Sequence, residues 1–335
     1  MSALRIAPKL LLLCCTAGTA VGADTSAPDA VGTATPSPEP LYAAPTNEDR
    51  SGRILADVHV NGRGPYRFII DTGANRSAIS PRLVTDLGLL PSAAGVLQTH
   101  GVTGSASLPA VDVEELRAGD FAYDPGPLPV LAGVVLGDSD GILGTEGLTG
   151  ARVEVDFASD RVSITQSDGK RAKQGYFVVP VQIYRGLLLV KGKAGRMPVQ
   201  AIIDTGAERT LGNALLRDAL IGKVSRDRQS LSRVIGATDV GYDGTSFKVP
   251  ALHIGSASLY NMPVTFGDMH VFDVWGLTNE PAVLIGMDVI GKLRRFAVDY
   301  RRSEIHLMPT GPERSTVRKC GPTECRSRIP EPDST

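Results

Sequence analysis

The sequence predicts an all-β protein made of two similar halves. Gly (37) and Pro (23) are plentiful among the 335 residues and aromatic residues make up only 5%, a balance that favours short strands joined by many turns. The second observation is an internal repeat, because Ile-Ile-Asp-Thr-Gly-Ala occurs twice, ending at Ala74 and at Ala207. Hydrophobic residues make up 42%, enough for a substantial core in one large domain or two of ordinary size.

Residues 1–23 are typical of a secretory signal peptide. Arg5 and Lys9 precede an apolar run over 10–20, and Val-Gly-Ala at 21–23 is a small-residue cleavage site. The run is short for a transmembrane helix, so we expect an exported protein, periplasmic or extracellular, with no span in the mature chain. An uncleaved anchor and lipidation at Cys14 or Cys15 remain alternatives.

Composition divides the rest of the chain. Residues 24–49 are rich in Pro, Ala and Thr without periodicity, which predicts a disordered linker. Two related halves follow at 50–170 and 171–310, and 311–335 is expected to be an irregular tail.

Each half should open with a hairpin. In the first half, strands over 54–60 and 66–70 flank an Asn-Gly turn. In the second half, strands over 187–190 and 198–203 flank an expected turn at 191–195. A short helix should follow each repeat, starting after the capping residues Ser80 and Asn213.

The end of each half also repeats. Ile142-Leu-Gly and Leu284-Ile-Gly are each followed two residues later by an acidic residue, and closing strands match at 153–157 and 296–300. The offset between copies grows from 133 to 143 residues, which indicates an insertion of about ten residues in the second half.

A buried apolar strand running into Asp-Thr-Gly places a carboxylate on a tight turn. Two such turns can bring Asp71 and Asp204 face to face, the arrangement needed to split a peptide bond with water and no metal. On these residues the chain resembles a single-chain, duplicated member of the retropepsin-like aspartic proteases, over roughly 50–308. The resemblance implies a bilobal acid-protease fold of two β-barrel halves related by a pseudo-twofold axis.

The resemblance implies an aspartic endopeptidase. Asp71 and Asp204 would share a proton, one activating the attacking water and the other bonding the carbonyl oxygen, with no fixed role for either. An extended polypeptide would bind in the cleft as an added strand, without a cofactor, and the two half-sites in one chain suggest a monomer. The alternative is a catalytically silent peptide-binding or scaffolding protein of the cell envelope.

Other site residues follow from the resemblance. Thr72 and Thr205 would hydrogen-bond across the axis, while Gly73 and Gly206 would permit the tight turns. Two glycine-bearing hairpin tips are candidate flaps over the substrate: Gly101, Val102, Thr103 and Gly104, and Ile235, Gly236, Ala237 and Thr238.

The repeat departs from retroviral enzymes at a supporting ion pair. Those enzymes usually carry Asp after Asp-Thr-Gly-Ala and Arg after the later Gly, where this chain has Asn75 and Glu208, then Thr145 and Met287. We therefore expect one of two outcomes for the arginines of the repeats. Arg76 and Arg209 either pair with Glu146 and Asp288 or are solvated surface residues.

The remaining patterns exclude several functions. The net charge of −1 and the lack of a long basic run exclude nucleic acid as an expected partner. The five histidines lack metal-ligand spacing, so no metal site is expected. After signal removal only Cys320 and Cys325 remain, with four residues between them in a Gly-Pro turn. An oxidising compartment favours a disulfide between them over two free thiols.

Overall fold

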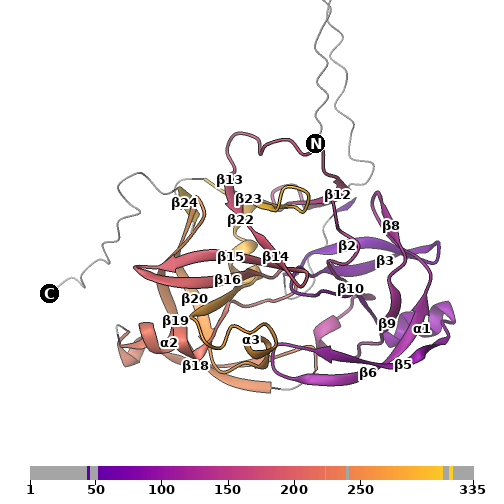
Figure 1. Ribbon diagram of the computed structural model, residues 1–335, viewed down its shortest axis with the longest axis horizontal. Coiled ribbons are helices and arrows are strands. Elements are labelled where there is room, and N and C mark those ends of the chain that lie inside the picture. The colour runs from indigo at the N-terminus through magenta and orange to yellow at the C-terminus, as the bar shows by residue number, and fades with distance from the viewer. Residues whose placement is uncertain (1–43, 46–51, 223, 239–240, 312–316, 320–335) are drawn as a thin grey trace, which may run out of the picture. The chain divides into compact units, whose positions relative to one another are not determined.

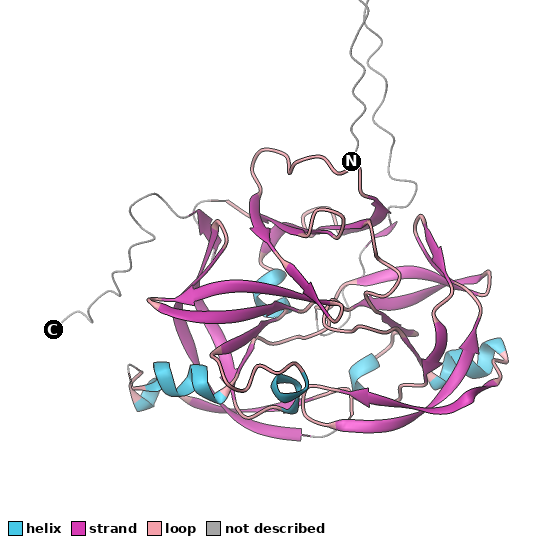
Figure 2. Ribbon diagram, in the orientation of Figure 1, coloured by secondary structure: helices cyan, strands magenta, loops and turns pink. Residues whose placement is uncertain are grey.

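The computed structural model describes residues 44–45, 52–222, 224–238, 241–311 and 317–319. All of these belong to one compact unit, residues 40–335. Strands predominate over short helices, as Figure 2 shows, and they form two lobes, so the predicted all-β bilobal fold is confirmed.

The first lobe is formed by the elements from β2 to β10. Its strands and helices are β2 (Leu55–Val60), β3 (Arg63–Ile70), β4 (Ala78–Ile79), α1 (Pro81–Leu87), β5 (Pro91–His100), β6 (Ser105–Val113), β7 (Leu116–Ala118), β8 (Phe121–Tyr123), β9 (Gly126–Pro129), a 3-10 turn (Val134–Leu136) and β10 (Gly141–Leu143). One sheet has the order β4-β10-β3-β2-β7-β8, and a second has the order β5-β6-β9.

The second lobe repeats this plan in a single larger sheet. Its elements are β14 (Gln182–Tyr184), β15 (Leu187–Ala194), β16 (Met197–Ile203), β17 (Leu211–Gly212), α2 (Ala214–Ile221), a 3-10 turn (Arg226–Arg228), β18 (Ser230–Ile235), β19 (Gly241–Ile254), β20 (Ala257–Phe266), α3 (His270–Val274), β21 (Ala282–Ile285) and α4 (Met287–Ile290). The order is β14-β15-β16-β21-β17-β20-β19-β18.

A third sheet joins the lobes, and we call it the interlobe sheet. It contains β1 (Ala44–Pro45), β11 (Ala151–Asp156), β12 (Arg161–Gln166), β13 (Phe177–Pro180), β22 (Leu293–Asp299) and β23 (Glu304–Pro309). In the order β1-β12-β11-β22-β23-β13, antiparallel β11 and β22 connect the two halves. Figure 1 labels β12, β13, β22 and β23 of this sheet in the upper part of the view.

Local signals account for both predicted helices. Ser80 caps α1 by accepting a hydrogen bond from the N–H of Leu83, and Asn213 caps α2 in the same way through Leu216. Each cap satisfies an N–H group that the first turn leaves without a partner. The predicted helix starts are therefore confirmed.

The structure corrects three expectations. The turn predicted at 191–195 is wrong, since β15 continues to Ala194 and pairs with both β16 and β19. Two strands lie in segments expected to be irregular. Ala44–Pro45 of the linker pairs with β12, and Val317–Lys319 of the tail (β24) pairs with β20.

The core runs through both lobes and the interlobe sheet. A single cluster of buried side chains extends from Val58 and Phe68 in the first lobe to Val199 and Phe247 in the second. Buried residues alternate with partly exposed ones along β11, as expected for a sheet with one face on the core. This shared core holds the two Asp-Thr-Gly loops in position.

Candidate active site

Equivalent strands position the two aspartates. Asp71 follows β3 and donates its N–H to the carbonyl of Leu143 on β10, over 3.0 Å. Asp204 follows β16 and makes the matching 3.0 Å bond to Ile285 on β21. Both pairs of neighbouring strands are parallel, so each lobe presents its aspartate from the same kind of loop.

Thr72 and Thr205 interlock the two loops. Each backbone N–H donates to the other residue's Oγ1 over 3.1 Å. Each hydroxyl then donates to a carbonyl of the opposite lobe, Thr72 to Ile203 at 2.8 Å and Thr205 to Ile70 at 2.6 Å. Both threonines are buried, so these bonds are shielded from water and fix the two loops relative to each other.

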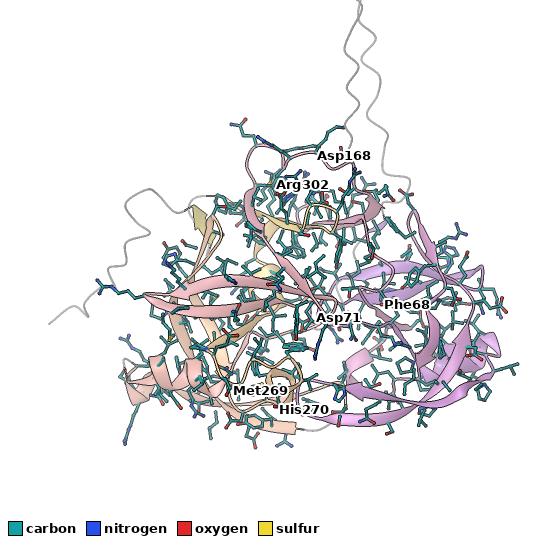
Figure 3. The ribbon with its side chains drawn as sticks, viewed as in Figure 1. Phe68, Asp71, Asp168, Met269, His270 and Arg302 are labelled. Atoms are coloured by element: carbon teal, nitrogen blue, oxygen red, sulfur yellow. The ribbon has the colours of Figure 1, made fainter. Side chains whose placement is uncertain are left out.

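The absence of a side chain at Gly73 and Gly206 allows the carboxyl groups to approach. A Cβ added at Gly73 would lie 2.7 Å from Oδ1 of Asp204, and one added at Gly206 would lie 2.5 Å from Oδ1 of Asp71. Each glycine also donates its N–H to the aspartate of its own loop, over 2.8 and 2.9 Å. The two carboxyl groups hydrogen-bond directly with each other (Figure 3 labels Asp71 between the two lobes).

The environment favours a shared proton. Burial, the negative charge of Asp71 and the hydrogen bond between the carboxyls raise the pKa of Asp204 well above its usual value. Burial also raises the pKa of Asp71. The N–H of Gly73, the bond from Asp204 and the positive charge of Arg53 oppose that rise. The pair therefore holds one proton at pH values where isolated carboxyls are ionised.

The hydroxyl residue that follows each repeat supports the loop. Ser77 Oγ accepts the N–H of Gly144 over 2.9 Å, and Thr210 Oγ1 accepts the N–H of Gly286 over 3.1 Å. Thr210 also donates to Asp288 over 2.7 Å. The repeated hydroxyl was visible in the sequence, but its bond to the later glycine requires the fold.

Of the two outcomes expected for Arg76 and Arg209, the structure shows exposed arginines rather than ion pairs with Glu146 and Asp288. Arg76 is exposed and donates to the carbonyl of Pro127 at 2.9 Å, while Glu146 accepts the N–H of Ser77 at 2.7 Å. Arg209 is exposed, and among the described residues it forms no ion pair with Asp288. Exposed pairs contribute little, and the loops are held by hydroxyl and amide groups.

Both candidate flaps lie over the same central region. The tip 101–104 joins β5 to β6, and the tip 235–238 lies at the end of β18 before β19. The tips contact each other, since Gly236 donates its N–H to Thr103 Oγ1 over 3.2 Å. Figure 1 shows these hairpins in the lower part of the view, opposite the interlobe sheet.

Each flap tip packs into the lobe opposite its own. Val102 of the first lobe packs on a second-lobe cluster around Phe272 and Leu284, and its carbonyl accepts the N–H of Val271 over 3.1 Å. Ala237 of the second lobe packs on a first-lobe cluster around Ile69 and Ile142. The structure thus brings both predicted flap segments together in a closed arrangement.

A cavity lies to one side of the dyad loops. It has a volume of about 560 Å³, and Asn75, Glu146, Arg185 and Tyr300 are among its lining residues. These residues come from both lobes and from the end of β22. Neither aspartate lines this cavity, so it is adjacent to the dyad rather than part of it.

Two residues near the dyad were missed by the sequence analysis. Arg53 is buried just before β2, and its charge acts on Asp71. Tyr300 is buried after β22, where burial and the charge of Asp71 raise its pKa. The sequence contained one signal for Tyr300, because the matching position at the end of the first closing strand is Phe157.

Some expectations concern residues outside the described part of the chain. Residues 1–23, including Cys14 and Cys15, and the pair Cys320 and Cys325 fall there. Within the described ranges, no helix has the length and apolar character needed to span a membrane. The same ranges contain no cluster of three or more potential metal-ligating His, Cys, Asp or Glu side chains.

Two interlocked Asp-Thr-Gly loops in a bilobal β fold define a retropepsin-like protein. The sequence model described as aspartyl protease matches the chain twice, at residues 56–147 and 190–289. Together the two matches cover more than half of the chain, one in each lobe, and the chain belongs to this family. A comparison with curated protein sequences found no match.

Proposed function

We propose that this protein is an aspartic endopeptidase that hydrolyses peptide bonds with water activated between Asp71 and Asp204. The observation that carries the proposal is the close apposition of two carboxyl groups across the interlocked loops, with Asp204 buried, Asp71 partly buried and the pKa of each raised. Family membership supports a protease-type function in general. The hydrogen-bonded dyad supports the specific chemistry.

The chemistry follows from one proton shared by two carboxyls. The ionised carboxyl takes a proton from a water molecule, whose oxygen attacks the carbonyl carbon of the scissile bond. The protonated carboxyl gives its hydrogen to the carbonyl oxygen as negative charge develops there. The carboxyl that took the proton from water then gives a proton to the leaving nitrogen, and the C–N bond breaks.

The flaps supply a binding surface for an extended peptide. Their tips meet each other, and opening them would expose backbone groups of β5, β6, β18 and β19. An extended polypeptide could bond to such groups as an added strand. We further propose export to the periplasm or the exterior, on the basis of the signal-like N-terminus.

The test is digestion of a denatured protein by the purified mature chain, from about pH 3 to about pH 8, with and without pepstatin. We expect pepstatin-sensitive cleavage that Asp71→Asn and Asp204→Asn each reduce to background, because either change removes the shared proton with little change in volume. Unchanged circular dichroism would show that both variants fold. If wild type cleaves nothing at any pH, or if either variant keeps normal turnover, the proposal is wrong.

A further inference from the structure

The two dyad loops are nearly identical in their own hydrogen bonds. Asp71 Oδ1 accepts the N–H of Gly73 over 2.8 Å, and Asp204 Oδ1 accepts the N–H of Gly206 over 2.9 Å. The threonines of the loops also make matching bonds. These matching contacts alone would give the two carboxyl groups similar affinity for the shared proton.

The strands beside the loops are not identical. In the first lobe, Leu55 pairs with Ile69 and the carbonyl of Ile54 accepts the N–H of Ile70 over 2.9 Å, so the next residue pair is Arg53 with Asp71. Side chains directly opposite in an antiparallel pair lie on the same face.

The corresponding pair in the second lobe is different. Leu188 pairs with Ile203, so Leu187 stands opposite Asp204. Arg53 is 3% exposed and Leu187 is 4% exposed. One aspartate therefore has a buried cation as its cross-strand neighbour, where the other has a buried aliphatic side chain.

Few other ionisable groups act on the dyad. Of the described residues around it, the loop segments 72–74 and 205–207 and the flap tips 101–104 and 235–238 contain none. From the interlobe sheet, Tyr300 lies close enough for the charge of Asp71 to raise its pKa. Tyr300 stays protonated at the pH values of interest and carries no charge.

We propose that Arg53 breaks the symmetry of the dyad, so that Asp71 is the ionised carboxyl and Asp204 keeps the proton. This inference rests on the proposed function and assigns each aspartate its role. A full positive charge in a water-poor site favours the ionised form of a neighbouring carboxyl much more strongly than it would in water. The pKa directions agree, since Arg53 lowers the pKa of Asp71, while burial and the charge of Asp71 raise that of Asp204.

The assignment sets the direction of the first step. The Asp71 carboxylate takes a proton from water as the water oxygen bonds to the substrate carbonyl carbon. The π electrons of the carbonyl move to its oxygen, which takes the proton of Asp204. The charge then lies on Asp204, and the product of this step is a neutral gem-diol. Arg53 touches no reacting atom, so it is a positioning residue.

The first experiment changes Arg53 and measures the pH profile of kcat/KM. Arg53→Leu copies the residue of the second lobe, Arg53→Gln removes the charge but keeps polar atoms, and Arg53→Lys restores the charge. The acid limb reports ionisation of the base in the free enzyme. We expect both neutral variants to move this limb by roughly one pH unit to higher pH, about a tenfold loss on the limb, and Arg53→Lys to return it to the wild-type position.

The matched control is Arg161→Leu, which removes one charge from an exposed position on β12. It should leave the limb in place. The position of the limb does not depend on how much enzyme is folded, so partial loss of stability does not imitate the effect. An unchanged limb in the neutral variants of an active enzyme overturns this inference and leaves the proposed function intact.

A second measurement avoids changing Arg53. In Asp204→Asn only Asp71 can titrate at the dyad, and in Asp71→Asn only Asp204 can. Carbon NMR of labelled aspartate carboxyls should show Asp71 titrating at lower pH than Asp204 in these near-isosteric variants. Equal or reversed titration would overturn the role of Arg53. Loss of all cleavage in wild type would instead contradict the proposed function.

Discussion

Gly73 and Gly206 occupy the places where a side chain would displace the carboxyl of the opposite loop. A Cβ at either position would meet the other lobe's aspartate inside normal contact distance. Because the obstruction is another buried functional group rather than a flexible surface chain, the loops cannot yield without moving the dyad.

The first prediction concerns Gly73→Ala. We expect kcat to fall by about 100-fold or more, since a displacement near 1 Å at reacting groups has an effect of that size. The measurement is steady-state kinetics on a peptide substrate. The comparison variant is Gly222→Ala at the end of α2, where φ is −64° and no atom lies within 4 Å of an added Cβ. Normal kcat in Gly73→Ala would show that the two loops are not closely apposed.

The second prediction concerns pH and stability. Burial and the charge of Asp71 raise the folded-state pKa of Asp204, so wild type loses stability as the pH rises from the unfolded pKa of about 4 through the folded value. Asparagine cannot ionise and avoids this loss. Asp204→Asn should therefore have a higher Tm than wild type at pH 7, and the difference should shrink as the pH falls to about 4. A difference that does not change with pH would contradict the raised pKa.

At the scale of elements, the crossed flaps couple the two lobes. Val102 packs on the cluster around Phe272 in the second lobe, and Ala237 packs on the cluster around Ile69 in the first. Each flap is therefore held closed by side chains of the opposite lobe. Since the tips also hydrogen-bond with each other, release of one weakens the seat of the other.

The third prediction tests this seat with Val102→Thr. The change keeps the shape but places a hydroxyl against apolar side chains, at a cost of about 1–3 kcal/mol. We expect faster amide exchange at residues 100–104 and 235–238 and a higher KM. Val96→Thr on the same hairpin is the matched control, because Val96 is 60% exposed. Equal exchange in the two variants would mean that Val102 does not hold the flap.

Sequence patterns predicted the elements that depend on local signals. The caps Ser80 and Asn213 sit at the predicted helix starts because their side chains satisfy nearby N–H groups. The turn at 191–195 failed because Gly192 serves close strand approach: a Cβ there would lie 2.7 Å from the carbonyl of His253 on β19. A glycine needed for a turn and one needed for close approach look the same in sequence.

The residues of the candidate site also fall into two groups, those that local sequence predicts and those that depend on the fold. Asp71 and Asp204 could be proposed from a repeated motif, because the strand and the loop are both local. Arg53 could not, since its place opposite Asp71 depends on strand register. The sequence also could not decide between ion pairs and solvated arginines, because the solvent exposure of Arg76 is set by packing of distant segments.

At the scale of the whole molecule, the interlobe sheet joins the two lobes in one compact unit. β11 pairs with β22 over five residue positions, and buried Phe296 and Val298 belong to the same core as side chains of the first lobe. Arg295 of β22 also pairs with Asp156 of β11 at 2.6 Å. Separating the lobes would expose this core and unpair two strands.

The fourth prediction is a single cooperative unfolding transition. Trp275, the only tryptophan, lies in the second lobe at the end of α3, so its fluorescence reports that lobe alone. Far-UV circular dichroism reports strands of both lobes. We expect the two signals to give the same midpoint and slope in urea. A second circular dichroism transition after the tryptophan change would show that the first lobe unfolds separately.

The covalent link between the halves has a further consequence. An enzyme assembled from two identical chains must carry every residue in duplicate, so an arginine beside one aspartate would also stand beside the other. Here the two copies differ at Arg53 and Leu187, and at Tyr300 and Phe157. In a single chain, the two halves are encoded separately, so each can change without the other. Substitutions can accumulate in one copy and turn two interchangeable partners into a pair with separate duties.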